Sequence, residues 1–238
     1  RLSRLQKDAS ARFGLKADEV LAICQSLYEK HKLTSYPRTD CDYLPESQHA
    51  EAPAILSALA VIHPGLQALL PQANPGLKSS AWNDKKVTAH HAIIPVRGDG
   101  ATVADLSDKE RKVYDLIART YLAQFFPPYE YEKTVVESLF AAETFRATGL
   151  RPLVPGWKAV FPAKAAKEKA DSDEAEAEQT LPAIVLNETA HNLGSEAREK
   201  QTTPPKAYTD GTLIADMESV HRVVAAKTKA IDNKWLKL

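Results

Sequence analysis

The sequence predicts an α+β protein with more than one domain, on three observations. Apolar residues recur at helical spacing through the first 125 or so positions, short runs rich in Val, Phe and Thr follow between Gly and Pro, and a helical pattern returns after residue 200. A chain of 238 residues is long enough for one large domain or two to three small ones. We expect a helical domain over 1–124, a strand-rich domain over 125–200, and the start of another helical domain over 201–238.

The helical part contains three well-marked segments. Residues 17–31 place Val20, Cys24 and Leu27 on one face, with acidic residues in the first turn, where the helix dipole favours negative charge. Pro45 opens a second segment with Ile55, Leu59 and Ile62 on one face. In the third, Ser107 and Glu110 have the S-x-x-E spacing of a capping box, which predicts a helix that begins there.

The middle part reads as strands joined by turns. We expect strands in "KTVVESLF", "ETFRAT", "WKAVF" and "PAIVLNE". Between the last two, the segment near 163–180 holds six acidic residues and three lysines but no aromatic residue, so we expect a solvated, disordered loop. A Pro-Pro turn then leads into a helix with Thr209 as N-cap and with Leu213, Met217, Val220 and Val224 on one side.

Composition narrows the class of protein. Thirty-one basic residues balance 31 acidic ones, so bulk charge does not indicate a nucleic-acid-binding protein, and any such affinity must come from local patches. The two cysteines, Cys24 and Cys41, favour a reducing compartment, and Cys24 fits a helix core. No signal peptide and no uninterrupted apolar run of 18 residues is seen, so we expect a soluble cytoplasmic protein without membrane contact.

The segment "LTSYPRTDCDYLPE", residues 33–46, carries the first candidate chemistry. A tyrosine is a poor nucleophile at neutral pH unless positive charge stabilises the phenolate, and an arginine can also neutralise phosphate oxygens. In an extended segment Arg38 lies on the same side as Tyr36, and Pro37 keeps Tyr36 out of helical geometry. The alternative is structural: Tyr36 covers an apolar patch and Arg38 pairs with Asp40.

The segment "DKKVTAHHAIIP", residues 84–95, contains the second group of candidate functional residues. Adjacent histidines chelate metal poorly, so His90 is better interpreted as a proton carrier or a donor to phosphate, with Lys85 and Lys86 adding positive charge. A strand entering the core is the alternative. The Asp-x-Asp pairs at 40/42 and 171/173 are interpreted as local pairing or solvated charge, so we expect no metal site in this chain.

Together these segments resemble the type IA DNA topoisomerases, and most closely bacterial topoisomerase III. Residues 5–45 resemble the family's run into its catalytic tyrosine, "NDKKVTAHHAIIP" resembles the next family motif, and "TTPPKAYTDGTLIADM" resembles the segment that re-enters the family's DNA-binding domain. Three motifs in the family's order make this resemblance specific, and it spans almost the whole chain.

The resemblance implies a mechanism and its parts. Tyr36 would open one DNA strand and hold its 5′ phosphate, Arg38 would hold the scissile phosphate, and His90 would contact the phosphate or assist proton transfer. Resealing would need no ATP, and the product would be relaxed or decatenated DNA. The strand-rich part would be the arch of a toroidal core, hinged at "FFPPYE" and "TTPPK". The substrate would be single-stranded or underwound DNA, with Lys85 and Lys86 on its backbone and Trp82 as a candidate stacking residue, although a core Trp is equally expected.

The sequence departs from the family's pattern at single positions and in the parts of the enzyme that it includes. Val96 stands where the family usually has Thr, and Asn83 where it commonly has Asp. The family's N-terminal domain, which would bind Mg²⁺, and the C-terminal part are not seen in the sequence. We therefore expect a full-length enzyme that is monomeric and needs magnesium, and a chain that alone is inactive. The alternatives are an inactive single-stranded-DNA-binding fragment and a recombinase or relaxase, although neither the arginine set nor the histidine triad of those enzymes is present.

Overall fold

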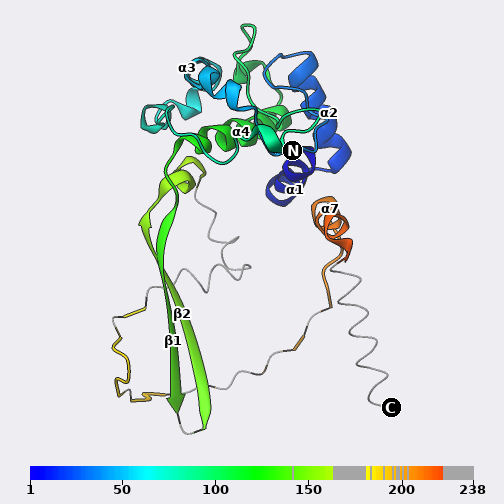
Figure 1. Cartoon of the computed structure of the whole chain (residues 1–238). Helices are drawn as coiled ribbons and strands as arrows, with labels where there is room; N and C mark the ends of the chain where they lie inside the picture. The colour runs from blue at the N-terminus through cyan, green and yellow to red at the C-terminus, as the bar shows by residue number, and fades with distance from the viewer. Residues whose placement is uncertain are drawn as a thin grey trace. The chain divides into compact units, whose positions relative to one another are not determined.

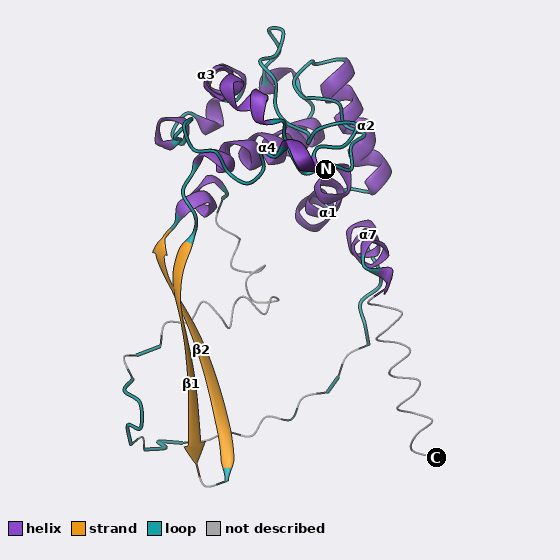
Figure 2. Cartoon of the chain, viewed as in Figure 1, coloured by secondary structure: helices purple, strands orange, loops and turns teal. Residues whose placement is uncertain are grey.

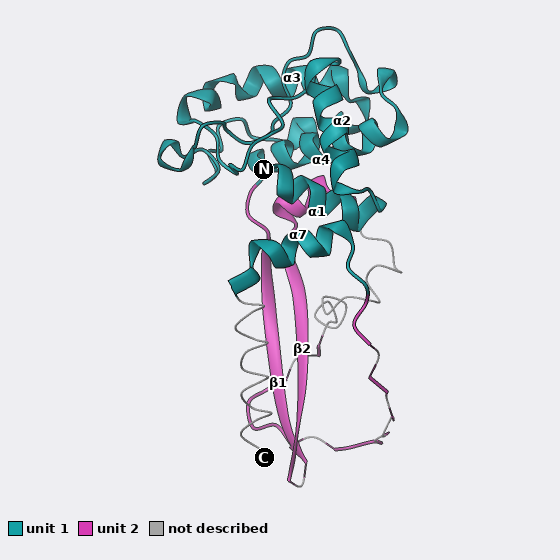
Figure 3. Cartoon of the chain, turned by 90° about the vertical axis from the view of Figure 1, so that its right-hand side faces the viewer, with its two compact units in different colours: residues 1–126, 207–238 teal, residues 127–206 magenta. Residues whose placement is uncertain are grey.

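The computed structural model describes residues 1–140, 142–162 and 204–221, together with shorter stretches between 181 and 202. It divides the chain into two compact units, one made of residues 1–126 and 207–238 and the other of residues 127–206 (Figure 3). The division differs from the three expected segments, because the chain after residue 206 joins the first unit instead of starting a third. Each unit is described by itself.

The first unit is helical (Figure 1). Its described α-helices are α1 (Leu2–Phe13), α2 (Ala17–Glu29), α3 (Ala52–Ile62), α4 (Asp108–Leu122) and α7 (Asp210–Glu218). Short 3₁₀ turns fill much of the connections, among them Glu46–Glu51 before α3 and Asp84–Lys86 after Trp82. No helix in the described part of the chain is long and apolar enough to cross a membrane.

The helix starts follow the signals in the sequence. The Ser107 hydroxyl accepts a hydrogen bond from the Glu110 backbone N–H, and the Glu110 carboxylate accepts from the Ser107 N–H, so the predicted capping box is confirmed. Thr209 is likewise the N-cap of α7, as predicted. Helix α4 packs against α1 and α2 and supplies much of the core, with Val113, Tyr114 and Leu122 fully buried. Cys24 is buried in α2, as predicted.

Helix α7 returns to the first helix of the chain. The Ala17 N–H donates to Asp210 (2.8 Å), Ser3 donates to Glu218 (2.6 Å), and Lys7 forms an ion pair with Glu218. A side chain at Gly211 would come within 2.9 Å of the Ser10 Cβ, so only glycine permits this approach. The predicted apolar side of the helix is exposed at Leu213, Met217 and Val220, and Val224 lies outside the described residues.

The second unit is built on one hairpin (Figure 2). Strand β1 (Glu130–Phe140) pairs antiparallel with β2 (Glu143–Val154), in a register that places Phe140 opposite Glu143 and Glu132 opposite Arg151. These two facing charges form an ion pair of 2.6 Å. The strands predicted in "KTVVESLF" and "ETFRAT" are confirmed, and both are longer than predicted.

Two other predicted strands are wrong. "WKAVF" lies in a 3₁₀ helix, Gly156–Val160, because Gly156 has φ +48° and the Trp157 N–H turns back to the Pro127 carbonyl (2.9 Å). The described residues of "PAIVLNE" form no strand: Asn187 has φ +64°, and the Glu188 N–H closes a turn on Val185. The segment near 163–180, predicted to be a disordered loop, lies outside the described residues, and so does the second Asp-x-Asp pair.

Candidate functional site

Backbone pairing brings the tyrosine segment and the histidine segment together. The Ser35 N–H donates to the Ile94 carbonyl (2.9 Å), the Val96 N–H donates to the Leu33 carbonyl (3.0 Å), and Thr34 and Pro95 form an antiparallel bridge between these two bonds. The end of the "HHAIIP" motif is therefore extended and paired, and this pairing fixes the position of Tyr36 relative to the two histidines.

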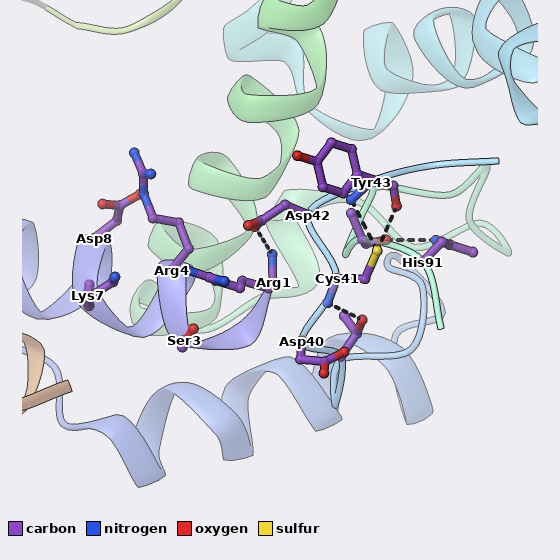
Figure 4. Close-up of polar contacts among 12 residues, drawn as sticks. Arg1, Ser3, Arg4, Lys7, Asp8, Asp40, Cys41, Asp42, Tyr43 and His91 are labelled. Carbon is purple, nitrogen blue, oxygen red and sulfur yellow. Dashed lines mark hydrogen bonds and ion pairs between the residues drawn. The ribbon is translucent and has the colours of Figure 1, made fainter. Parts of the chain in front are cut away.

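Side chains that the sequence analysis did not select reinforce this pairing. The Ser35 hydroxyl donates to the Ala92 carbonyl (3.2 Å) and accepts from the Ile94 N–H (2.9 Å). The Thr39 hydroxyl donates to the His90 carbonyl (3.2 Å). The buried Cys41 Sγ accepts from the Tyr43 N–H at 3.3 Å (Figure 4). In the sequence, the one sign of these contacts is that short hydroxyl and thiol side chains flank the Tyr-Pro-Arg segment, and this sign is weak.

Tyr36 is held at the surface beside His90. Their ring centroids lie 4.7 Å apart with the planes tilted by 32°, and the Tyr28 ring stands edge-on to Tyr36 at 5.7 Å. The Tyr36 side chain is 38% exposed, and its hydroxyl has no hydrogen-bond partner among the described residues. A hollow of about 250 Å³ beside the two rings is lined also by Pro45, Val87 and His91.

Arg38 lies on the same exposed side as Tyr36. From Tyr36 to Asp42 exposed residues alternate with buried ones, and Pro37 is fully buried, which is the pattern of an extended segment lying on a core. Arg38 forms no ion pair with a described residue. The alternative pairing with Asp40 is not formed, since Asp40 accepts a hydrogen bond from Thr88 instead (3.2 Å).

Lys85 and Lys86 lie in the 3₁₀ turn Asp84–Lys86, close in sequence to the histidines. The Asn83 side chain caps this turn by accepting from the Lys85 N–H (3.1 Å). The Lys86 ammonium donates to the Tyr43 hydroxyl (3.2 Å) and lies 4.8 Å from the centre of its ring, whereas Lys85 extends into solvent. Both charges are exposed, so both can meet a phosphate backbone.

Trp82 is a core residue, so its interpretation as a candidate stacking residue is wrong. Its side chain is only 4% exposed and packs on His49 (4.8 Å between ring centroids) and Phe125 (5.4 Å). The Trp82 backbone also forms a bridge with Leu44. A ring enclosed in this way cannot stack on a nucleic-acid base, so the structural alternative, a core Trp, is what the structure has.

The described residues do not form a metal centre. No group of three or more His, Cys, Asp or Glu side chains among them is placed to hold an ion. Near Tyr36, Asp40 bonds Thr88, and Asp42 points to the backbone nitrogen of Arg1 (Figure 4). These two carboxylates belong to separate local contacts and do not converge.

Comparison with known proteins identifies the family. The sequence profile of a family described as DNA topoisomerase matches residues 1–222. The chain is 42% identical over 226 residues to DNA topoisomerase 3 of Pasteurella multocida and 39% identical over 232 residues to DNA topoisomerase 3 of Bacillus subtilis. These matches cover 95% and 97% of this chain but 33% and 31% of the two relatives, so the chain spans about a third of their length.

A solved structure agrees at the level of the fold. Full-length topoisomerase I from Thermotoga maritima superposes with a TM-score of 0.56 at 21% identity, over 92% of this chain and 34% of that one. Because the profile match covers nearly all of the chain, the assignment holds for both of its units. The chain belongs to the type IA DNA topoisomerases, with bacterial topoisomerase III among its relatives.

Proposed function

We propose that this chain carries the nucleophilic half of a topoisomerase active site, which breaks and reseals one DNA strand. The observation that carries the proposal is the placement of Tyr36. It is exposed, its ring lies 4.7 Å from that of His90, and it is on the same exposed side as Arg38; neither the Tyr36 hydroxyl nor the Arg38 guanidinium has a polar partner among the described residues. A buried tyrosine could not reach a phosphate.

In the proposed reaction the Tyr36 Oη attacks the scissile phosphorus. A P–Oη bond forms, the P–O3′ bond breaks, the tyrosine proton leaves, and the departing 3′ oxygen gains a proton. Arg38 neutralises the phosphate oxygens, and His90 donates to the phosphate or carries the proton. The 5′-phosphotyrosyl ester retains the energy of the broken bond, so the 3′ hydroxyl reseals the strand without ATP.

The substrate that fits is single-stranded or underwound DNA. Lys85 and Lys86 supply charge for its backbone, and Trp82 has no part in binding because it is buried. Strand passage would require opening of the second unit; the unit boundaries at residues 126/127 and 206/207 adjoin the two Pro-Pro segments, which remain the candidate hinges. We propose also that the full-length enzyme relaxes or decatenates DNA and does so as a monomer.

The described residues of this chain offer no magnesium site, since no three of their His, Cys, Asp or Glu side chains are placed to hold one ion. If the reaction needs Mg²⁺, the ion is held elsewhere in the enzyme, and no step above depends on it. The second candidate function is a DNA-binding fragment without activity. Two observations favour it: the described residues include no set of metal ligands, and the chain spans only about a third of the relatives' length.

Covalent trapping on a 3′-end-labelled single-stranded oligonucleotide tests the proposal. We expect a denaturation-resistant labelled adduct when the chain is mixed with the remaining N-terminal part of a topoisomerase 3 and magnesium, and none with Tyr36→Phe. Tyr28→Phe is the matched control, because Tyr28 is equally exposed and contacts Tyr36. An adduct that survives Tyr36→Phe refutes the role of Tyr36. No adduct from the associated, DNA-bound halves favours the binding fragment.

A further inference from the structure

The ring of Tyr28 contacts the Tyr36 ring edge-on. Their centroids lie 5.7 Å apart, and the ring planes make an angle of 84°. Aromatic pairs favour this arrangement, because the positive edge of one ring meets the negative face of the other. Tyr28 belongs to α2 and not to the Tyr-Pro-Arg segment. A helix of the core therefore reaches the nucleophile through one aromatic side chain.

Ring contacts are what orient the Tyr36 side chain. Its hydroxyl has no hydrogen-bond partner among the described residues. The backbone bonds of Ser35 fix where the residue lies but leave the rotation of its side chain open. His90, at 4.7 Å and a tilt of 32°, supplies one contact, and Tyr28 supplies the other. Without Tyr28, no described ring except that of His90 would restrain the phenol.

Tyr28 is itself firmly placed. Helix α2 buries Val20, Cys24 and Leu27, and Tyr28 directly follows Leu27 near the end of the helix. Long side chains on a helix have few allowed rotamers, so the helix fixes the direction of the ring. The Tyr28 hydroxyl forms no hydrogen bond with a described residue. The ring, and not the hydroxyl, is therefore the part that acts on Tyr36.

Lys32, just after α2, has a strained backbone and carries a charge next to Tyr28. Its φ is +53°, in the left-handed region that is uncommon for residues other than glycine. The Leu33 N–H donates to the Leu27 carbonyl (2.9 Å) and closes this turn. The Lys32 ammonium lies 5.9 Å from the centre of the Tyr28 ring, at the outer limit of a cation–π contact. Strain of this kind is concentrated at functional sites, and here it accompanies a contact to the ring that touches the nucleophile.

We propose that Tyr28 is a positioning residue for the nucleophile: its ring holds the Tyr36 ring beside His90, and Lys32 holds the ring of Tyr28. The inference rests on the proposed function. No atom of Tyr28 takes part in the reaction. Its loss lets the phenol turn away from the orientation in which Tyr36 attacks, so it slows the formation of the P–Oη bond without weakening the binding of DNA.

Single-turnover cleavage at saturating oligonucleotide tests this role, with the chain, the N-terminal part of a topoisomerase 3 and magnesium. Anisotropy gives the Kd for the same oligonucleotide. We expect Tyr28→Leu to lower the cleavage rate about tenfold and to leave Kd unchanged. That factor corresponds to about 1.4 kcal/mol, near the upper end of what an edge-to-face pair contributes. Tyr28→Phe keeps the ring and should restore the wild-type rate.

Lys32→Asn separates positioning from stability. Asparagine adopts the left-handed region more readily than lysine, so urea unfolding should show equal or greater stability, while the loss of the ammonium should lower the cleavage rate about twofold. A merely structural role would move stability and rate in the same direction. Lys30→Asn is the matched control, because Lys30 is an exposed lysine of the same turn that contacts no described ring, and it should cleave as the wild type does.

NMR of the chain with ¹³C-labelled tyrosine reads the geometry without cleavage. The Tyr36 ring resonances, identified by their absence in Tyr36→Phe, should shift in Tyr28→Leu and stay close to the wild type in Tyr28→Phe, since the ring current of residue 28 is lost only in the first. Lys32 is exposed, so its variant still tests the contact if Tyr28→Leu does not fold.

The outcomes separate this inference from the proposed function. If Tyr28→Leu cleaves at the wild-type rate while Tyr36→Phe forms no adduct, the positioning role is refuted and the proposed function stands. If Tyr28→Leu weakens Kd but cleaves normally at saturation, Tyr28 is a DNA contact, and the positioning role is refuted again. If the wild type forms no adduct, the proposed function fails and the positioning role fails with it.

Discussion

Ionisation of Glu110 should make the stability of the helical unit depend on pH. Its carboxylate accepts hydrogen bonds from Ser26 (2.6 Å) and from the backbone and side chain of Ser107, and it lies 3.4 Å from the Nε2 of the buried His31. Burial raises the pKa of Glu110, but the hydrogen bonds from Ser26 and Ser107 and the charge of His31 outweigh it and lower the pKa from 4.5 to about 2.

The size of the effect follows from this shift. One pKa unit corresponds to about 1.4 kcal/mol, so the shift sets an upper limit of about 3 kcal/mol on what ionisation of Glu110 contributes to stability. The side chain is 15% exposed, and water competes for its oxygens, so we expect about 1–2 kcal/mol. Because the folded pKa lies below the unfolded one, this stability is fully present above pH 4.5 and is lost as the pH falls toward 2.

The perturbation is Glu110→Gln, which removes the charge but keeps a residue that can complete the capping box. Urea unfolding followed by circular dichroism should show a loss of about 1–2 kcal/mol at pH 7, and the difference from the wild type should shrink below pH 4.5. Glu29→Gln, an exposed glutamate with no ion pair among the described residues, is the control and should have no effect. A Glu110→Gln difference that is absent at pH 7, or equally large at pH 3, refutes the reasoning.

Two further substitutions and one labelling experiment test other parts of the structure. Tyr114→Phe removes a buried hydroxyl that has no partner among the described residues, and it should leave the free energy of unfolding unchanged or raise it by about 1 kcal/mol; a loss of stability would reveal a missed hydrogen bond. Gly156→Ala would place a Cβ 2.2 Å from the Pro128 carbonyl oxygen at a positive φ, so it should destabilise the hairpin unit by more than about 2 kcal/mol, seen as a lower melting temperature by circular dichroism; a native melting curve would contradict this. Burial raises the pKa of the Cys24 thiol to about 12, so iodoacetamide should modify it at pH 8 only after urea unfolding, and labelling of the folded chain, read by peptide mass spectrometry, would contradict its placement.

Features set by neighbours in sequence were predictable. The helix that Ser107 begins, the helix that Thr209 begins and the two strands of the hairpin depend on residues within a few positions, and the structure has them where the pattern places them. The common side of Tyr36 and Arg38 was predictable for the same reason, because alternation along an extended segment is a local property.

Features set by distant residues were not predictable from pattern alone. "WKAVF" has the composition of a strand, yet the bond of Trp157 to Pro127 bends it into a turn. Trp82 is enclosed by His49 and Phe125, residues that only tertiary packing brings near. The docking of α7 on α1 depends on the absence of a side chain at Gly211 against Ser10, and nothing near residue 211 in the sequence points to residue 10.

The same distinction explains how the site is built. A Tyr-Pro-Arg segment alone has nothing to orient it, and a His-His-Ala-Ile-Ile-Pro segment alone reads equally well as a core strand. The structure joins them through Ser35, whose backbone bonds Ile94 and whose hydroxyl bonds Ala92 and Ile94, and through Thr39, which bonds the His90 carbonyl. These four contacts leave the Tyr36 hydroxyl free while fixing the rings of Tyr36 and His90 side by side. Tyr36 and His90 thus stay exposed while the residues between them hold the two segments together, which is the arrangement that the proposed nucleophilic role of Tyr36 requires.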